Sequence, residues 1–271
     1  MGTHEFGNLA STLRGNTKLI LTRCKMAQRD FRVKKVTTYQ ASRWQQYAEL
    51  VVGKSDLVSL LKYELIMFFL GDLPGALGLY LRSKLYPILL GAVGRNVIFG
   101  RGITLRHPHK IRIGHDVIID DHCMLDAKGQ SNAGIIIEDR VFIGRNSILY
   151  CKDGDIEIRS RVNISFNCGI FSSRRITIGP GTLIAAYCYI MSGGSYDVNS
   201  NINFADQDGY AKGPTNIGED CWLGAGVVVM DGVQIGRGCV VGTGTVVRKD
   251  VADSAVIASS EGPRTLYIRQ H

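Results

Sequence analysis

Six histidines and seven cysteines are the residues of this 271-residue sequence that could bind a metal or move a proton near neutral pH. Histidine suits a general base because its pKa lies near neutrality, whereas Cys-x-x-Cys spacing would indicate a metal or redox site. No Cys-x-x-Cys pair occurs in the sequence. The histidines are His4, His107, His109, His115, His122 and His271. What they do depends on the elements that carry them.

An aliphatic residue recurs every six positions toward the C-terminus. The series is Ile217, Leu223, Val229, Ile235, Val241 and Val247, and glycine directly follows four of the six. A small or β-branched residue stands four places after each member. A period of six fits neither an amphipathic helix nor a simple alternating strand. It fits a chain that makes one short strand and one turn every six residues.

The same period extends backward through the chain in triplets. They are Val93/Phe99/Leu105, Ile113/Ile119/Leu125, Ile137/Ile143/Leu149, Ile158/Ile164/Ile170 and Ile178/Ile184/Ile190. Spacing between triplets is longer, and it reaches 27 residues after Ile190. Three six-residue units per turn of a triangular prism place every insertion at one corner. The sequence therefore predicts an all-β parallel β-helix over residues 93–252, with about seven coils (turns of the prism) stacked ~4.8 Å apart.

Five cysteines occupy the small-residue position of this repeat, four places after an aliphatic residue. They are Cys123, Cys168, Cys188, Cys221 and Cys239. A free cysteine at such a position acts as a small buried hydrophobe. We therefore expect neither a disulfide framework nor a metal site, which agrees with a cytoplasmic location.

The first 55 residues are expected to form a basic leader, solvated and partly disordered. Residues 1–62 hold eleven Lys/Arg against four Asp/Glu, a net charge of +7 out of +8 for the chain. Such a segment could face a membrane surface or a nucleic acid, and we expect no nucleic-acid partner. No secretory signal is visible in the sequence.

Residues 56–92 show helical patterns that Gly71–Pro74 interrupts, and a second helix is expected from Gly75 to Leu85. The apolar run is too short and too broken to cross a membrane. Two interpretations remain open. The helices cap the first coil, whose open strand edges need cover, or they lie at a membrane interface beside the basic leader. Residues 253–271 are expected to form a C-terminal tail.

The run KGPTNIGEDCWLGAGVVVMDGVQIGRGCVVGTGTVVRKDV, residues 212–251, resembles the hexapeptide-repeat O-acetyltransferases, which fold as left-handed β-helices. Galactoside, maltose and polysaccharide-associated acetyltransferases belong to this family. The resemblance implies a homotrimer that uses acetyl-CoA or another acyl-CoA without a metal, with active sites between adjacent prisms. The γ-class carbonic anhydrases share the fold and need three zinc histidines, but we do not expect His109, His115 and His122 to form such a site.

The resemblance places a histidine base in the long corner insertion, residues 191–216, where it takes the proton of the acceptor hydroxyl. This insertion contains no histidine. Alignment puts Ser195 or Tyr196 at that position, and both are weak bases. Asp197, the next residue, could serve if it is desolvated. The candidate catalytic residues are therefore Ser195, Tyr196 and Asp197.

Near the acceptor, sugar acetyltransferases tend to carry an asparagine where this chain has Ser165. Asn167 lies two residues on and is the expected substitute. On the donor side, the resemblance implies that small residues and a tryptophan line the CoA groove and that basic residues face the nucleotide phosphates. These residues are Trp222, Gly224, Ala225, Thr243, Arg248, Lys249 and Arg264.

The resemblance and the repeat together predict a CoA-dependent O-acyltransferase, most simply an acetyltransferase, acting on a saccharide or glycoconjugate hydroxyl at a trimer interface. The alternative is a catalytically silent trimeric scaffold or binding protein that has lost the histidine. The expected location is the cytoplasm. A second possibility is that the N-terminal segment holds the protein in peripheral contact with the inner face of a membrane.

Overall fold

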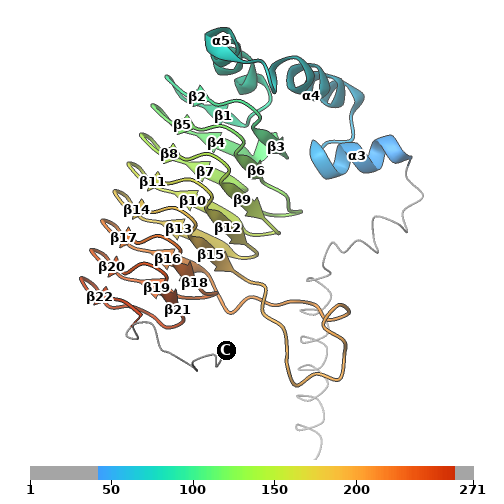
Figure 1. Cartoon of the computed structure of the whole chain (residues 1–271). Helices are drawn as coiled ribbons and strands as arrows, with labels where there is room; N and C mark the ends of the chain where they lie inside the picture. Colours follow the sequence, from blue (N-terminus) through green and yellow to red (C-terminus); the bar gives the residue numbers. More distant parts are fainter. Residues whose placement is uncertain (1–41, 260–271) are drawn as a thin grey trace, which may run out of the picture. The chain divides into compact units, whose positions relative to one another are not determined.

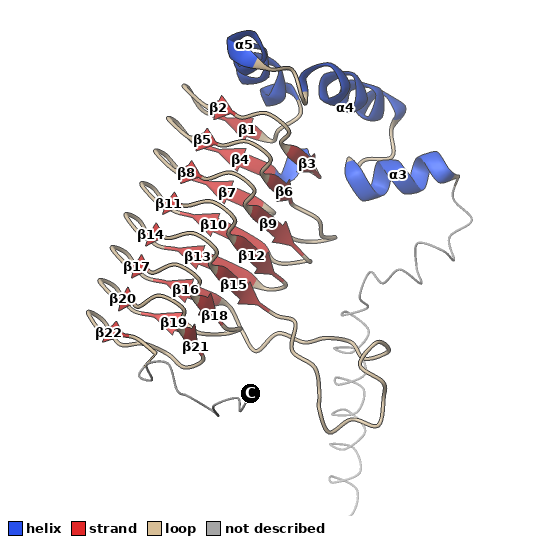
Figure 2. Ribbon diagram, in the orientation of Figure 1, coloured by secondary structure: helices blue, strands red, loops and turns tan. Residues whose placement is uncertain are grey.

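The computed structural model describes residues 42–259. Most of the basic leader, Arg264, His4 and His271 lie outside the described residues. Three α-helices come first in the described part, and a stack of short parallel strands follows (Figure 1; Figure 2).

The strands form three parallel sheets, one on each face of a triangular prism. The first face contains β1 (Ala92–Val93), β4 (Ile111–Ile113), β7 (Ile135–Ile137), β10 (Asp155–Ile158), β13 (Arg175–Ile178), β16 (Thr215–Ile217) and β19 (Gln234–Ile235). The second contains β2 (Ile98–Phe99), β5 (Ile118–Ile119), β8 (Phe142–Ile143), β11 (Asn163–Ile164), β14 (Leu183–Ile184), β17 (Trp222–Leu223), β20 (Val240–Val241) and β22 (Val256–Ile257). The third contains β3 (Thr104–Arg106), β6 (Met124–Asp126), β9 (Ile148–Cys151), β12 (Gly169–Ser172), β15 (Tyr189–Ser192), β18 (Val228–Val229) and β21 (Val246–Val247).

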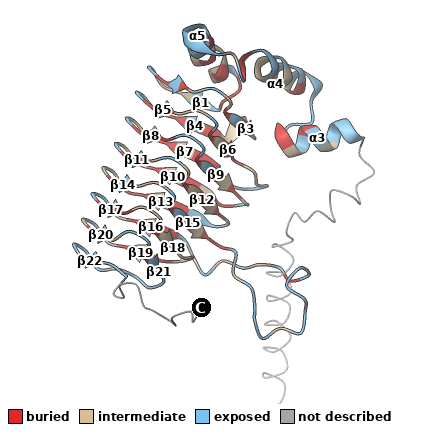
Figure 3. Cartoon of the chain, viewed as in Figure 1, coloured by how far each residue is buried: buried red, intermediate tan, exposed pale blue. Residues whose placement is uncertain are grey.

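The six-residue period fixes both the register and the core. Aliphatic residues of successive coils stand directly opposite one another, as Ile164 does with Ile184. These aliphatic residues are buried, while most of their strand neighbours are intermediate or exposed (Figure 3). The predicted β-helix is therefore confirmed, and β22 adds one strand of an eighth coil beyond residue 252.

The cysteines lie where the repeat predicts. All six described cysteines are buried and unbridged, including Cys151, whose burial the repeat did not predict. Burial raises the pKa of the Cys123 thiol to about 12. These thiols pack as small apolar groups inside the prism.

Helices cover the first coil of the prism. They are α3 (Arg43–Val51), α4 (Leu57–Leu70) and α5 (Gly75–Leu85), followed by the 3-10 turn η1 (Tyr86–Ile88), and η2 (Pro108–Lys110) lies between β3 and β4. The predicted bounds of the second helix are confirmed, whereas α3 was not predicted. The buried Tyr63 hydroxyl donates to the Leu105 carbonyl (2.8 Å), and the Tyr86 ring packs edge-on against Phe99. The inner faces of the helices thus complete the core at this end.

A buried arginine joins the two long helices to the prism. The Arg82 guanidinium donates to the carbonyls of Leu70 (3.1 Å), Leu73 (2.7 Å) and Phe99 (3.0 Å). It therefore satisfies carbonyls at the end of α4 and in β2 that burial would otherwise leave unpaired. Among residues 42–259, none of the helices has both the length and the apolar character needed to cross a membrane.

Candidate active site at the insertion loop

The long insertion leaves the prism after β15 and returns at β16 (Figure 1). It departs through Gly193 and Gly194, whose φ angles of 118° and 83° lie in the region that side chains disfavour. A Cβ atom on Gly193 would lie 2.5 Å from Ser173 Cβ. Both glycines are therefore required by the turn that starts the loop. Residues 199–208, the distal part, group apart from the prism as a separate compact unit.

A short antiparallel bridge closes the base of the loop. The Ser195 amide donates to the Tyr210 carbonyl (3.0 Å), and the Tyr210 amide donates to the Ser195 carbonyl (2.8 Å). This bridge, called the neck below, holds Ser195 in a defined position beside the third face.

A carboxylate on the next coil binds both strands of the neck. Asp231 Oδ2 accepts hydrogen bonds from the Lys212 amide (2.7 Å) and from Ser195 Oγ (3.3 Å). Asp231 is only 5% exposed, and within the described residues its Oδ1 atom is buried without a hydrogen-bond partner. The neck therefore contains a hydroxyl and a desolvated carboxylate oxygen, the elements of a proton-accepting pair.

Asp231 is not among the site residues predicted from the sequence. Two signals could have identified it. It is an acidic residue in the otherwise apolar run VVVMDGVQI, and it lies one coil after the loop at the same corner of the prism. This corner, where the third face meets the first, is called the insertion corner below. A carboxylate is expensive to bury unless it makes hydrogen bonds. Its position at that corner predicts that the loop supplies those bonds.

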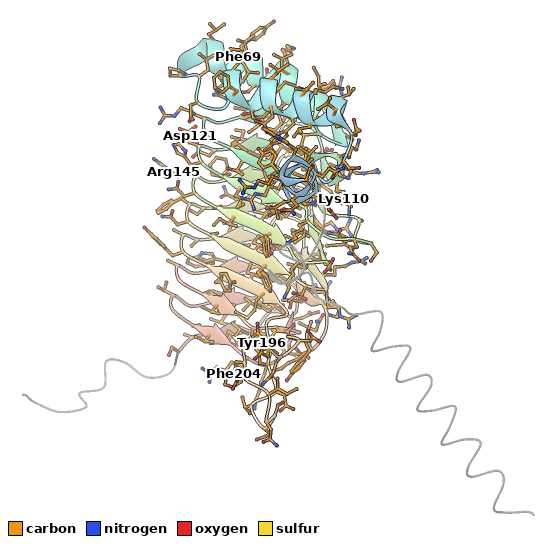
Figure 4. The ribbon with its side chains drawn as sticks, turned by 90° about the vertical axis from the view of Figure 1, so that its right-hand side faces the viewer. Phe69, Lys110, Asp121, Arg145, Tyr196 and Phe204 are labelled. Atoms are coloured by element: carbon orange, nitrogen blue, oxygen red, sulfur yellow. The ribbon has the colours of Figure 1, made fainter. Side chains whose placement is uncertain are left out.

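The other two candidate bases lie on the outer side of the neck. Tyr196 is exposed at the end of the prism opposite the helices (Figure 4), and its ring lies over Gly209. Asp197 is exposed as well. Asp231 is buried, whereas Asp197 is exposed, and the base role considered for Asp197 stays a prediction.

The candidate acceptor residues lie on a different corner from the neck. Ser165 and Asn167 occupy the turn between β11 and β12, where the second face meets the third. Asn167 has a φ of 55°, a left-handed conformation that asparagine tolerates well. The same turn position is left-handed in neighbouring coils, for example at Asn146 and Gly226. Turn geometry thus accounts for the presence of an asparagine at position 167.

The donor-side residues follow this same corner through later coils. Trp222 points outward from β17 and is 55% exposed. Ala225 and Thr243 take equivalent turn positions on successive coils, and the Gly244 amide donates to the Ala225 carbonyl (2.8 Å). A Cβ atom on Gly224 would lie 2.7 Å from the Thr243 nitrogen, so this glycine is needed for coil stacking.

The basic donor-side residues are not beside that corner. Arg248 and Lys249 are exposed after β21, at the insertion corner. The third face separates them from Trp222 and Thr243, as it separates the neck from Ser165. Within one chain, the structure therefore divides the candidate site into two groups on different corners.

The histidines of the described residues lie far from the neck. His107 and His109 pack near the end of α3, where the His107 amide donates to the Val51 carbonyl (2.8 Å). Burial lowers the pKa of His109. His115 and His122 are exposed turn residues, as expected. In the described part of the chain, no three His, Cys, Asp or Glu side chains come together as a metal site.

Comparisons with known proteins agree with the repeat. Residues 214–249 match the family model described as bacterial transferase hexapeptide (six repeats), and residues 134–171 match the hexapeptide repeat of succinyl-transferase. A probable acetyltransferase of Mycobacterium tuberculosis is 33% identical over 116 residues, which cover 43% of this chain and 38% of that protein. A galactoside O-acetyltransferase of Lactococcus lactis is 32% identical over 99 residues, or 35% of this chain and 48% of that one.

Among solved structures, the polysialic acid O-acetyltransferase OatWY is similar with a TM-score of 0.46 and 21% identity, over 65% of this chain and 86% of that chain. The matched segments span less than half the length of the two curated relatives named above. Two hexapeptide-repeat models thus match separate parts of the prism.

Proposed function

We propose that this chain is a CoA-dependent O-acyltransferase that transfers an acyl group, most simply acetyl, to a hydroxyl of a saccharide. The observation that carries the proposal is the pairing of Ser195 with the buried Asp231 at the neck of the insertion loop. The pair lies in the loop where related enzymes are expected to hold their base. The named curated relatives, an acetyltransferase and a galactoside O-acetyltransferase, support the same reaction class.

In the proposed reaction, Ser195 and Asp231 accept the proton of the acceptor hydroxyl. The hydroxyl oxygen bonds to the thioester carbonyl carbon, and the carbon–sulfur bond breaks. The acceptor proton passes to Ser195 Oγ while Ser195 gives its own proton to Asp231, and the departing thiolate then takes a proton back. Asp231 is buried and accepts directly from Ser195 Oγ, whereas Asp197 is exposed, which favours Asp231 as the proton acceptor.

The corner between the second and third faces, called the donor corner below, fits the donor substrate. No described atom lies within 4 Å of where a Cβ atom on Gly244 would stand, so a chain-like ligand can approach the backbone there. Trp222 offers an exposed ring beside this corner. Arg248 and Lys249 supply exposed cations for phosphate groups, but they belong to the other corner.

We infer that a complete site forms between copies of the chain in a homotrimer. Outward residues of the second face form an apolar ladder: Ile98, Ile118, Phe142, Leu183, Trp222, Val240 and Val256, interrupted by Asn163. The first face instead carries ion pairs, such as Arg159 with Glu138 and Glu157 (both 2.7 Å). An exposed apolar ladder is typical of a subunit interface. Packing of this face would bring one copy's donor corner toward another's insertion corner.

Calorimetric titration with acetyl-CoA, followed by a transfer assay on a panel of saccharides, tests the proposal. We expect micromolar binding and the appearance of free thiol that depends on the added saccharide. Trp222→Ala should weaken donor binding, whereas Val198→Ala, an exposed apolar change on the loop, should not. A folded protein that binds no acyl-CoA would contradict the proposal, and so would one that binds acyl-CoA but transfers to no saccharide.

A further inference from the structure

The outer side of α4 is apolar although it is exposed. Its inner arc, including Leu60, Tyr63 and Leu70, packs into the core. The outward residues cover roughly 120° of the helix, taking 100° per residue. They are Leu57, Val58, Leu61, Leu65, Phe68 and Phe69, all exposed. A helix that is apolar on its outer side as well as its inner side has a further surface to bury.

The neighbouring helix extends this apolar surface. Leu77, Leu79 and Tyr80 of α5 are exposed, and so is Ile88 in η1. Together with the outward residues of α4 they form what is called the apolar end below. Figure 4 places Phe69 at the helical end of the prism, away from Tyr196. The apolar end is therefore separate from the neck and from both corners of the candidate site.

Charges of both signs lie beside the apolar end, since Asp56, Glu64 and Asp72 lie on or next to the two helices as three exposed lysines do. Lys54, Lys62 and Lys84 are exposed on or beside the two helices, and Lys84 Nζ lies 5.8 Å from the centre of the Tyr80 ring. Residues 1–41, which precede these helices, contain eight Lys/Arg and two Asp/Glu, a net charge of 8 − 2 = +6. A protein partner would need a matching acidic surface, whereas an anionic bilayer supplies negative charge and an apolar interior together.

We propose that the apolar end binds the surface of an anionic lipid bilayer. Exposed Phe68, Phe69 and the leucines of α4 enter the boundary between head groups and acyl chains. Lys54, Lys62 and Lys84 at the margin contact the anionic head groups, and the net positive charge of residues 1–41 adds to the attraction. The prism then extends from the membrane surface with the neck toward its other end. This inference does not depend on the proposed acyl transfer.

The test is co-sedimentation of the full-length protein with vesicles of phosphatidylcholine alone or with one-third phosphatidylglycerol. We expect binding to the anionic vesicles, a decrease as salt increases, and little binding to phosphatidylcholine alone. The variant Phe68→Ser/Phe69→Ser removes two rings that are 81% and 63% exposed. It should lower the partition coefficient by roughly tenfold or more.

Val198→Ser is the matched control, because Val198 is 77% exposed on the insertion loop, outside both the apolar end and the apolar ladder of the second face. It should bind as the wild type does. The proposal is overturned if the wild type stays in the supernatant with anionic vesicles at low salt, or if the double variant binds as well as the wild type. It is also overturned if sedimentation velocity without vesicles shows that the double variant loses an oligomeric state, because a second copy would then occupy the apolar end.

Discussion

Ser195 Oγ lies 3.3 Å from Asp231 Oδ2, although 36 residues separate the two in the sequence. The contact joins the outgoing strand of the insertion loop to the next coil of the prism, and Lys212 joins the returning strand to the same carboxylate. Asp231 therefore does two things that can be separated by experiment. It holds the neck closed, and its Oδ2 atom accepts from Ser195 Oγ in a buried position, where it can take the Ser195 proton.

Replacing Asp231 with asparagine separates these two roles. The asparagine side chain would keep an oxygen that accepts from the Lys212 amide but would lose the negative charge. We expect kcat for acyl transfer to fall by about 10²–10³-fold, as for loss of a general base, with donor binding and the thermal unfolding midpoint nearly unchanged. Steady-state kinetics and calorimetry measure these quantities.

The matched control is Asp250→Asn, because exposed Asp250 lies at the insertion corner of the next coil and accepts from the Gln234 amide (2.9 Å). Its kcat should stay close to the wild-type value. Full activity of Asp231→Asn would show that Asp231 only anchors the loop.

Arg82→Met should destabilise the fold without affecting the neck. The change removes three hydrogen bonds from a buried guanidinium and leaves the carbonyls of Leu70, Leu73 and Phe99 unpaired. We expect the free energy of unfolding to fall by about 3 kcal/mol, measured by urea denaturation. Arg95→Met, a change at an exposed arginine, should alter it by less than about 0.5 kcal/mol. Equal effects of the two substitutions would refute the role assigned to Arg82.

The stability of the helical end should depend on pH through His109. Burial lowers the pKa of His109 below its ordinary value of 6.5, and the positive charges of Lys54, His107 and Lys110 act in the same direction. Above pH 6.5 the His109 side chain is neutral in both the folded and the unfolded state, so it contributes nothing to the pH dependence of stability. Below pH 6.5 the unfolded state binds the proton more readily, so stability falls as the pH decreases toward the folded-state pKa.

His109→Gln should remove this part of the pH dependence. The urea midpoint of the wild type should decrease between pH 7 and pH 5, and that of the variant should decrease less. If the two curves stay parallel over this range, His109 does not titrate as inferred.

Most of the prism could be predicted because its register is repeated in the sequence. Ile164 stands opposite Ile184 on the next coil, and the six-residue spacing within each coil repeats such pairs along the prism. The predicted solenoid ended at residue 252, because Ile257 follows Val247 by ten residues and so breaks the six-residue period. In the structure Val240 and Val241 pair with Val256 and Ile257, so the second face continues past the end of the predicted repeat.

The candidate site could be predicted only in part. The repeat located the insertion loop and the outward position of Trp222, because both depend on local spacing. It did not identify Asp231 as the partner of Ser195, since that contact depends on how the loop returns to the prism. The packing of α3 near His107 was missed for the same reason, because it depends on contacts distant in the sequence.

The central claim is that each active site combines the neck of one chain with the donor corner of another. Asp231→Asn and Trp222→Ala each damage one of these parts. In mixed trimers, Trp222→Ala chains supply intact necks and Asp231→Asn chains supply intact donor corners. With random mixing of equal amounts, about half of the sites have an intact neck and about half of those also have an intact corner. We therefore expect about a quarter of wild-type activity. Activity no higher than the mean of the two separate variants, from verified mixed trimers, would show that both parts act within one chain.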